Sequence, residues 1–433
     1  MLVCFSLKHI FALSVKRMTK VFEPKIFTTV KNTKHIFAGL SLLLLLCIPF
    51  SPSSGAGNPT TPGITETENC YDEVVPLSLE EIFSKRVSDQ LDSFYRRRHK
   101  VDGFNGCVMI AKDGKPIYSG AFGYGNFGLR DTLTTESSIQ LASCTKTFTS
   151  AAILLLAEQG FLSLDDSVQK FYPEFPYHGI TIRLLLSHRT GLPDYTYWDK
   201  YFIGKDVQYL TNQSLMELLA AKKPQVRCKP DHMFIYCNTN YAILASIIEN
   251  VTAISYHKFM HDFVFSPLGM TNTFAYDAEN QAGQYCTISY DSKGRIWKDC
   301  PSDGVVGDKG IYSSVDDMLK WDNALRSGLI LSRESLEEAY KPRSLDRYSF
   351  AKERGKNYGY GWRMQKQPDK SVLIYHNGFW HGSNNVFARD LTNGFTVIIL
   401  GNKSNHANYW TQPIWNTLGQ MKNLENMAEG EVQ

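Results

Sequence analysis

The sequence lacks the patterns that most often hold a metal ion or a nucleotide. It contains neither a CxxC pair nor an HExxH segment, which excludes the commonest zinc sites. Cys228, His232 and Cys237 lie near one another, but their spacing fits no common zinc site. No apolar helix follows the GxGxxG pattern at residues 123–128, so it predicts a glycine-rich strand end. We therefore expect no metal and no cofactor.

An excess of positive charge is also missing from most of the chain. The net charge is +3, but residues 1–35 alone carry seven Lys or Arg and one acidic residue. Residues 36–56 are uncharged, which leaves residues 57–433 with a net charge of −3. Without a basic stripe there is no electrostatic basis for nucleic-acid binding, so no nucleic-acid partner is expected. No repeat or low-complexity surface is visible, which argues against a structural envelope protein.

No apolar run is long enough for a comfortable membrane span. The leucine-rich run at residues 36–50 follows the basic segment and precedes the small residues at 53–56. This order is typical of a secretory signal, with cleavage after Ala56. We expect residues 1–56 to be a signal peptide or a membrane anchor, and any membrane contact to involve only this segment. The protein would then act outside the cytoplasm, in the periplasm or as a secreted protein.

Composition suggests one large domain after this segment. Residues 57–77 are rich in Pro, Gly, Thr and Ser and predict a linker. The domain is expected over residues 78–420, with a polar tail at 421–433. Hydrophobic residues make up 43% of the chain, which is ordinary for a globular enzyme with a sizeable core.

Cysteine usage leaves two interpretations open. Seven of the nine cysteines lie beyond residue 56, and an odd number leaves at least one unpaired. Cys228 and Cys237 bound one short loop, and Cys286 and Cys300 bound another, so both pairs could form disulfides in an oxidising compartment. Buried free thiols are an equal alternative.

Predicted strands lie at both ends of the domain. Residues 107–111 and 116–122 flank Asp113-Gly114, a turn signal typical of a β-hairpin. Between the two ends, most segments show helical patterns broken by prolines. We predict an α+β fold, in which a mostly antiparallel sheet from both chain ends is flanked by helices, with a largely helical inserted lobe. A site would form between the lobes. The strands near the C-terminal end are predicted at residues 371–375, 385–389 and 395–400.

Four Ser-x-x-Lys tetrads occur, and physical context favours one of them. Ser143 begins a predicted apolar helix that ends near Gly160. Lys146 then shares a face with Ser143, so its amine can lie beside the hydroxyl. A helix N-terminus also favours an alkoxide and offers N–H groups to an oxyanion. Ser143 is the predicted nucleophile, with Lys146 as its nearest proton acceptor. The other tetrads, in polar or charged segments, begin at Ser167, Ser255 and Ser349.

Two further segments offer groups that complete such a site. Tyr236 can act as a second base or proton shuttle, and Asn238 offers an amide that orients substrate. His376 follows a predicted strand and can place its ring against the nucleophile. Gly378 allows the backbone to approach closely, and the amide of Phe379 can be an oxyanion donor.

The three motifs, in this order, resemble those of the penicillin-recognising serine hydrolases. They read SCTK at 143–146, YCN at 236–238 and HNG at 376–378. The long intervals between them resemble the branch of class C β-lactamases and serine DD-peptidases. Further matching stretches are LLLSHRTGLPDY at 184–195, PLGMTN at 267–272, GIYSSVDDMLKW at 310–321 and YGYGW at 358–362.

The resemblance implies a role for each motif residue. Ser143 would be acylated, while Lys146 and Tyr236 would share the general acid and base work. Asn238 would hold the substrate amide. The amides of Ser143 and Phe379 would form the oxyanion hole.

The third motif departs from the family pattern. His376 stands where many members have lysine and some DD-peptidases have histidine, and Asn377 replaces a threonine hydroxyl. A neutral histidine would hold a substrate carboxylate less well than lysine, which weakens the case for efficient antibiotic hydrolysis. Asn377 and Gly378 would still border the substrate. Cys144 and Cys237 occupy variable motif positions and are expected to point away from the cleft.

The stretch around residue 190 contains side chains with open roles. Four aromatic residues either line a substrate cleft or pack in the core, with equal weight: Tyr195, Tyr197, Trp198 and Tyr201. His188 is interpreted as a structural loop residue and not as a base.

Together these features predict an exported serine hydrolase that acts through an acyl-serine intermediate. Its substrate would be a small molecule or peptide, such as a cell-wall D-Ala-D-Ala peptide, a β-lactam or an ester. The alternatives are an esterase or D-aminopeptidase on the same fold, or a catalytically silent penicillin-binding-like protein.

Overall fold

The computed structural model describes residues 79–198, 208–278, 286–344, 356–367, 369–405 and 407–430. The predicted signal or anchor segment and the predicted linker lie outside these ranges, as does the tetrad that begins at Ser349. Within these ranges, no helix combines the length and hydropathy that a membrane crossing requires.

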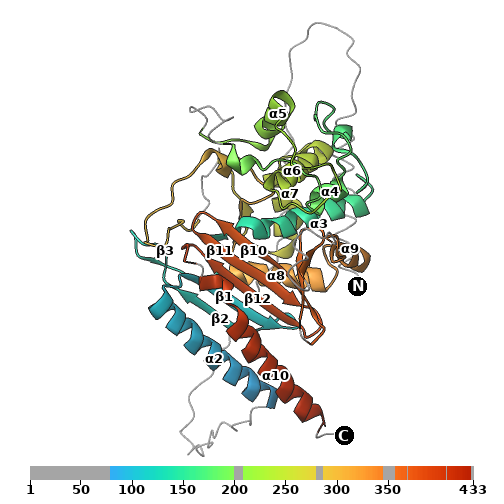
Figure 1. Ribbon diagram of the computed structural model, residues 1–433. Coiled ribbons are helices and arrows are strands. Elements are labelled where there is room, and N and C mark those ends of the chain that lie inside the picture. Colours follow the sequence, from blue (N-terminus) through green and yellow to red (C-terminus); the bar gives the residue numbers. More distant parts are fainter. Residues whose placement is uncertain are drawn as a thin grey trace, which may run out of the picture. The chain divides into compact units, whose positions relative to one another are not determined.

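A seven-stranded sheet lies at the centre of the domain (Figure 1). Its strands are β1 (Gly106–Lys112), β2 (Lys115–Phe122), β8 (Lys356–Tyr358), β9 (Arg363–Lys366), β10 (Val372–Trp380), β11 (Ser383–Asp390) and β12 (Phe395–Gly401). The spatial order is β2-β1-β12-β11-β10-β9-β8, and each of these pairs is antiparallel. Strands from the two chain ends therefore meet in one sheet, which confirms the predicted α+β arrangement.

Both faces of this sheet are covered. Val108 and Ile110 of β1 pack in one hydrophobic cluster, whereas Cys107 and Met109 pack in the other, as the two-residue period of a strand requires. The first cluster lies beneath α2 (Leu79–Asp102) and α10 (Gln412–Gly430), which run across the same face of the sheet (Figure 1). Helix α10 crosses the boundary predicted at residue 420.

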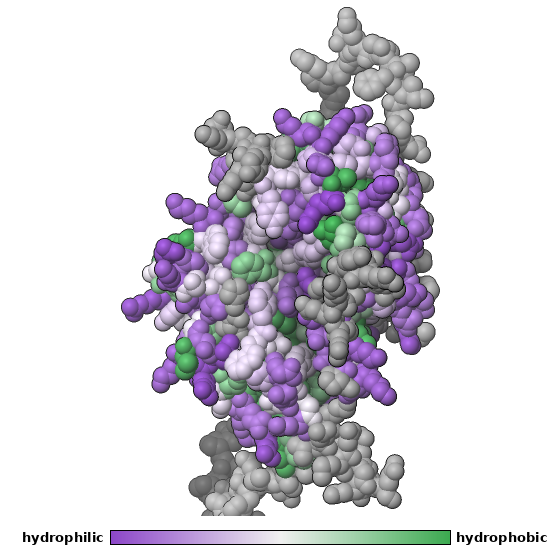
Figure 2. All heavy atoms as spheres, in the orientation of Figure 1, coloured by the Kyte–Doolittle hydropathy of each residue, from purple (hydrophilic) through white to green (hydrophobic). Residues whose placement is uncertain are grey.

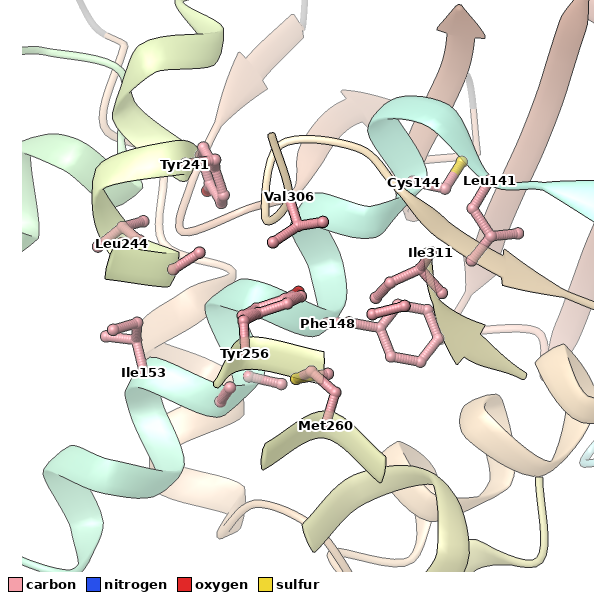
Figure 3. Close-up of a cluster of buried hydrophobic side chains, with 14 of the residues drawn as sticks. Leu141, Cys144, Phe148, Ile153, Tyr241, Leu244, Tyr256, Met260, Val306 and Ile311 are labelled. Atoms are coloured by element: carbon pink, nitrogen blue, oxygen red, sulfur yellow. The ribbon is translucent and has the colours of Figure 1, made fainter. Parts of the chain in front are cut away.

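The other face carries the helical lobe. Its helices are α3 (Thr145–Glu158), α4 (Ile182–Leu186), α5 (Asn212–Lys222), α6 (Asn238–Thr252), α7 (Tyr256–Met260), α8 (Val315–Arg326) and α9 (Arg333–Ala339). Residues 145–156 of α3 are all buried, so this helix is the centre of the lobe. Figure 3 shows Phe148 and Ile153 of α3 among side chains from α6, α7 and the segment that contains Val306 and Ile311. The Phe148 ring also stacks on Trp321 of α8, with 4.2 Å between centroids.

Short strands and turns complete the lobe and the hairpins. Asp113 and Gly114 both have positive φ, 48° and 79°, which is the turn predicted between β1 and β2. Gly160, with φ 75°, follows the end of α3 as expected. The short strands are β3 (Tyr124–Asn126), β4 (Asp131–Thr132), β5 (Ile139–Gln140), β6 (Phe274–Ala275) and β7 (Ile311–Ser313).

The cysteines of the described ranges are all free thiols, including the four proposed to pair. Of those four, Cys237 is buried, whereas Cys228, Cys286 and Cys300 are half-buried. On the face drawn in Figure 2, polar residues predominate and apolar side chains are scattered. Single apolar side chains scattered in this way are ordinary on a water-exposed protein surface.

Candidate active site

Ser143 lies in a tight turn that joins the sheet to the central helix. Residues Ala142–Cys144 form a 3-10 turn (η1), and α3 begins at Thr145, two residues later than predicted. Ala142 is in the left-handed region, with φ 48°, a conformation that costs on the order of 1–2 kcal/mol for a residue with a Cβ. Ala142 and Cys144 are buried, while Ser143 is half-buried. The strained turn thus presents this one hydroxyl to solvent.

Lys146 is fully buried behind that hydroxyl. Its Nζ lies 3.1 Å from Ser143 Oγ, and it also donates to Asn238 Oδ1 at 2.9 Å and to the backbone oxygen of Asp308 at 2.7 Å. Three acceptors match the three donors of an ammonium. When the amine is neutral, the lone pair is within reach of the Ser143 proton, which is the geometry of a general base.

The segment before α6 presents the second motif. The backbone N–H and Nδ2 of Asn238 both donate to Asp194 Oδ2, at 2.8 and 3.1 Å. These two hydrogen bonds to Asp194 hold the Asn238 side chain so that its Oδ1 accepts from Lys146 Nζ. The ring of Tyr236 lies 5.0 Å from Lys146 Nζ, so the phenol and the amine border the same nucleophile.

His188 supports this segment from behind. Its Nδ1 accepts the backbone N–H of Cys237 at 3.2 Å, and its ring centroid is 4.3 Å from that of Tyr236. Burial, together with nearby cations, lowers the pKa of His188 well below its usual value, so the ring is neutral. This placement agrees with the structural loop role expected for His188.

His376 lies behind the wall of the site. Its Nδ1 donates to the backbone oxygen of Asn377 at 2.7 Å, which leaves Nε2 to accept from the Tyr358 hydroxyl at 3.1 Å. The residue is fully buried, and burial, with Arg363 nearby, lowers its pKa well below the usual value. The neutral ring, 6.2 Å from that of Tyr236, packs behind the site and does not face solvent.

Gly378 allows β10 to touch the turn that carries Ser143. A Cβ at this position would lie 2.2 Å from the backbone oxygen of Leu141, closer than real side chains come. The close approach expected for Gly378 is therefore present. Its neighbours Asn377 and Phe379 border the site, and Phe379 is 49% exposed. The oxyanion role of the Ser143 and Phe379 amides stays a prediction.

These elements enclose a cavity of about 250 Å³. Five predicted residues line it, namely Ser143, Tyr236, Asn238, Asn377 and Phe379, whereas Lys146, His376 and Gly378 are not among the lining residues. Five further residues line the cavity that the sequence patterns did not indicate: Asp308, Lys309, Arg363, Trp380 and Tyr409. Arg363 directly follows the YGYGW stretch, and Lys309 directly precedes GIYSS, so both adjoin segments that carried the resemblance.

Two cations, Arg363 and Lys309, line the cavity. The guanidinium of Arg363 lies 5.2 Å from the Tyr236 ring centroid, and Lys309 Nζ lies 4.8 Å from that of Trp380. An arginine is always charged and can hold a carboxylate through two parallel hydrogen bonds. The positive charge that the third motif lacks is therefore supplied by β9.

Lys309 belongs to a buried charged group. Its Nζ is 3.5 Å from Asp308 Oδ2, and it also donates to the Tyr195 hydroxyl. Tyr195 in turn donates to Asp308 Oδ2 at 3.0 Å. Burial raises the pKa of Tyr195 well above its usual value, so the phenol keeps its proton. Tyr195 and Trp198 are buried, Tyr197 is exposed, and Tyr201 lies outside the described residues. Tyr195 contacts Asp308 and Lys309 of the cavity wall.

One described cluster brings three potential metal ligands together. Donor atoms of Cys300, Asp303 and His381 lie within 4.8 Å of one another. The Asp303 carboxylate already accepts from Trp380 Nε1 at 2.6 Å and from His381 Nε2 at 2.9 Å. These hydrogen bonds account for the carboxylate without an ion.

The two motif cysteines pack away from the cavity, as predicted. Cys144 Sγ donates to the backbone oxygen of His376 at 3.3 Å, and Cys237 Sγ donates to that of Leu192 at 3.4 Å. Burial raises the pKa of each thiol to about 12, so both stay protonated.

Comparison with known proteins gives the family. The Beta-lactamase family model matches residues 91–416. Penicillin-binding protein 4* of Bacillus subtilis (strain 168) is 32% identical over 321 residues, which cover 71% of this chain and 70% of that protein. The solved structure of the octameric penicillin-binding protein homologue from Pyrococcus abyssi has a TM-score of 0.64 and 29% identity, covering 73% of this chain and 74% of that one.

A further solved structure shares the fold at lower identity. D-amino acid amidase from Ochrobactrum anthropi SV3, complexed with L-phenylalanine amide, has a TM-score of 0.64 and 23% identity, covering 79% of this chain and 99% of the amidase chain. The family match covers most of the described domain, including all three motifs. The chain therefore belongs to the β-lactamase family and is a serine hydrolase.

Proposed function

We propose that this protein is an exported peptidase that forms an acyl-serine at Ser143, and that it acts on peptides with a free C-terminal carboxylate, such as cell-wall D-Ala-D-Ala peptides. The observation that carries this proposal is the buried Lys146 amine 3.1 Å from Ser143 Oγ. Export is supported by the basic, apolar and small-residue order of residues 1–56.

The geometry supports a two-step acyl transfer. Lys146 takes the hydroxyl proton as Ser143 Oγ attacks the carbonyl carbon, and the amides of Ser143 and Phe379 receive the oxyanion. Tyr236 passes a proton to the leaving amine, which departs and leaves the ester. Water then attacks the ester with Tyr236 as general base and regenerates the free hydroxyl.

Arg363 supports the choice of a carboxylate-terminated substrate. Because Tyr236 protonates the leaving group, the Arg363 guanidinium beside the Tyr236 ring lies at the leaving-group end of the cavity. A C-terminal residue that leaves as a free amino acid carries its carboxylate to this end. Simple esters and amides lack that charge, so the site favours peptides over them. β-Lactams also carry a carboxylate and are expected to acylate Ser143.

Active-site labelling and a substrate panel test the proposal. Full-length protein and Ser143→Ala are treated with fluorescent penicillin and with a fluorophosphonate, and are assayed on a D-Ala-D-Ala peptide, a p-nitrophenyl ester and a D-amino-acid amide. We expect both probes to label only the protein with Ser143, and the peptide to have the highest kcat/KM. No labelling by either probe would contradict the mechanism. A higher kcat/KM for the ester or the amide would instead favour an esterase or a D-aminopeptidase.

A further inference from the structure

A thiol, a carboxylate and an imidazole come together where the β10–β11 hairpin meets a separate loop. Donor atoms of Cys300, Asp303 and His381 lie within 4.8 Å of one another. Cys300 and Asp303 belong to the start of the short turn η6 (Pro301–Gly304), whereas His381 lies in the turn between β10 and β11. Asp303 is buried and the other two residues are half-buried, so the group is partly open to solvent.

The spacing of the three side chains suits a tetrahedral metal ion. In such a site, sulfur, nitrogen and oxygen ligands at ordinary zinc distances lie about 3.4–3.6 Å from one another. His381 Nε2 is 2.9 Å from Asp303 Oδ1 and 3.0 Å from Oδ2, so the imidazole and the carboxylate need to separate only slightly. The Cys300 sulfur would move toward them by on the order of 1 Å.

The carboxylate is already oriented by two other hydrogen bonds. The Cys300 N–H donates to Asp303 Oδ2 at 2.7 Å, and Trp380 Nε1 donates to Oδ1 at 2.6 Å. Each carboxylate oxygen has a further lone pair, which here faces His381 Nε2. An ion can therefore take the place of the Nε2 proton, which moves to Nδ1, while both outer hydrogen bonds remain. Hydrogen bonds of this outer kind orient the ligands of metal sites.

The imidazole is held by aromatic neighbours and by the turn. Its ring centroid lies 4.9 Å from that of Trp380 and 5.7 Å from that of Trp297. His381 has φ 49°, a conformation that is uncommon for a residue with a Cβ. The turn thus places this ring against Asp303, 78 residues earlier in the chain.

The chemistry of the three donors selects the kind of ion. Magnesium and calcium prefer oxygen ligands throughout, whereas thiolate and imidazole favour zinc and its transition-metal neighbours. Three protein ligands leave the fourth tetrahedral position to water.

We propose that Cys300, Asp303 and His381 bind one Zn²⁺ ion, which ties the β10–β11 hairpin to η6 beside the wall of the active-site cavity. The link to that wall is Trp380, which lines the cavity and donates to Asp303. The site does not include Ser143 or the groups around it, so the proposal is independent of the substrate.

A titration of the full-length, reduced protein tests the site. The protein is first freed of metal with a chelator, then titrated with Co²⁺ as a coloured substitute and finally with Zn²⁺. We expect a thiolate-to-cobalt charge-transfer absorption that saturates at one ion per chain and disappears when Zn²⁺ displaces Co²⁺. Because the ion binds the folded chain, the Tm should rise as free Zn²⁺ increases.

Two ligand variants are designed to keep the local structure. The Cys300 side chain accepts the backbone N–H of Asp303, and the oxygen of Cys300→Ser can accept the same bond as a helix cap. His381→Asn retains a residue type that tolerates positive φ. We expect Cys300→Ser to lose the charge-transfer absorption, and both variants to bind Zn²⁺ more weakly by at least about tenfold.

Cys228→Ser is the matched control, because it removes a half-buried thiol that is not part of the cluster. This variant should keep the native absorption and the native affinity for Zn²⁺. No charge-transfer absorption in the native protein, or native absorption in Cys300→Ser, would overturn the proposal. Native Zn²⁺ affinity in His381→Asn would overturn the three-ligand site. If Cys300→Ser does not fold, the native titration and His381→Asn still decide.

Discussion

At the scale of single residues, a positive charge in the cavity comes from Arg363 on β9 and not from the third motif, which lies on β10. The third motif offers His376, but burial lowers the pKa of this ring and its two nitrogens are occupied by Tyr358 and by the backbone of Asn377. Arg363 lines the cavity instead. Because β9 pairs with β10, Arg363 lies opposite Tyr375, next to the motif histidine. A cation is therefore available to a substrate carboxylate without a lysine in the motif.

Arg363→Gln separates binding of the carboxylate from the acyl chemistry. We expect KM for a D-Ala-D-Ala peptide to rise by about 10- to 100-fold, since one partner of a charge-assisted pair is lost. The same peptide with an amidated C-terminus should change by less than about threefold, because it brings no carboxylate to the cavity. Steady-state kinetics on the two peptides measure this.

A matched control lies on the same strand. Lys366→Gln removes an exposed cation of β9 that does not line the cavity, so both peptides should keep their native constants. Equal losses for both peptides in Arg363→Gln would show that this residue supports the fold of the site and does not recognise the carboxylate.

At the scale of elements, the site depends on the contact between β10 and the turn η1. Residues from η1, from the N-terminus of α6 and from β10 line one cavity. The turn is fixed from both sides: Leu141 donates its N–H to the backbone oxygen of Ile311 at 2.7 Å, and its own oxygen lies against Gly378. A small shift of β10 would therefore move Ser143 relative to Phe379, and with it the oxyanion geometry.

Gly378→Ala tests this dependence. The added methyl would lie 2.2 Å from the Leu141 oxygen, so β10 and η1 must separate. We expect a loss of about 1–3 kcal/mol in the free energy of unfolding, as for other overpacked sites. Labelling of Ser143 by fluorescent penicillin should slow by at least about tenfold, because misplaced oxyanion donors cost rate. Urea unfolding and labelling time courses measure the two effects.

Gly419→Ala is the matched control for that change. Gly419 lies in α10, and a Cβ there meets no atom within 4 Å. Alanine favours a helix over glycine by about 1 kcal/mol, so this variant should be as stable as the native protein or more so. Native labelling in Gly378→Ala would show that β10 does not position the nucleophile.

Local patterns in the sequence predict these elements better than they predict their contacts. The hairpin turn at Asp113-Gly114 and the strands near residue 398 were predicted because turn chemistry and apolar runs are local signals. The start of α3 was placed two residues early, because the left-handed Ala142 depends on tertiary packing of the turn. The start of α8 follows a local signal of this kind, because the Ser314 side chain accepts the backbone N–H of Asp317 as a helix N-cap.

The missed site residues are those that only the register brings into place. Arg363 reaches the cavity because residue 363 pairs with residue 375, a relation that no local pattern encodes. Asp308 and Lys309 lie in a loop without helical or strand periodicity. The backbone oxygen of Asp308 accepts from Lys146, which is 162 residues away in the sequence. By contrast, the three motifs were found because their residue types and order are specific.

At the scale of the whole molecule, burial on both faces of the sheet keeps several polar groups away from water. His188 and His376 are both fully buried, with ring centroids 4.3 and 6.2 Å from that of Tyr236. Burial lowers the pKa of both rings, so they stay neutral in the folded state near pH 7. In the unfolded chain each would titrate near its ordinary pKa of about 6.5.

This difference predicts that the protein loses stability in mild acid. Between pH 6.5 and the lowered pKa values, the unfolded chain binds more protons than the folded one, so the free energy of unfolding decreases as pH falls. One histidine that stays neutral in the folded state contributes a loss of about 1 kcal/mol between pH 6.5 and 5.5. Urea unfolding at pH 7.5, 6.5 and 5.5 measures the total.

His376→Gln identifies the contribution of one ring. Removing this imidazole should lower stability at pH 7.5, because the Tyr358 hydroxyl loses its acceptor. The further loss between pH 6.5 and 5.5 should, however, be smaller than in the native protein by about 1 kcal/mol. An unchanged loss would mean that His376 takes up its proton without unfolding. The cavity wall behind Tyr236 would then become cationic in mild acid, and the acidic limb of the pH–rate profile would move with it.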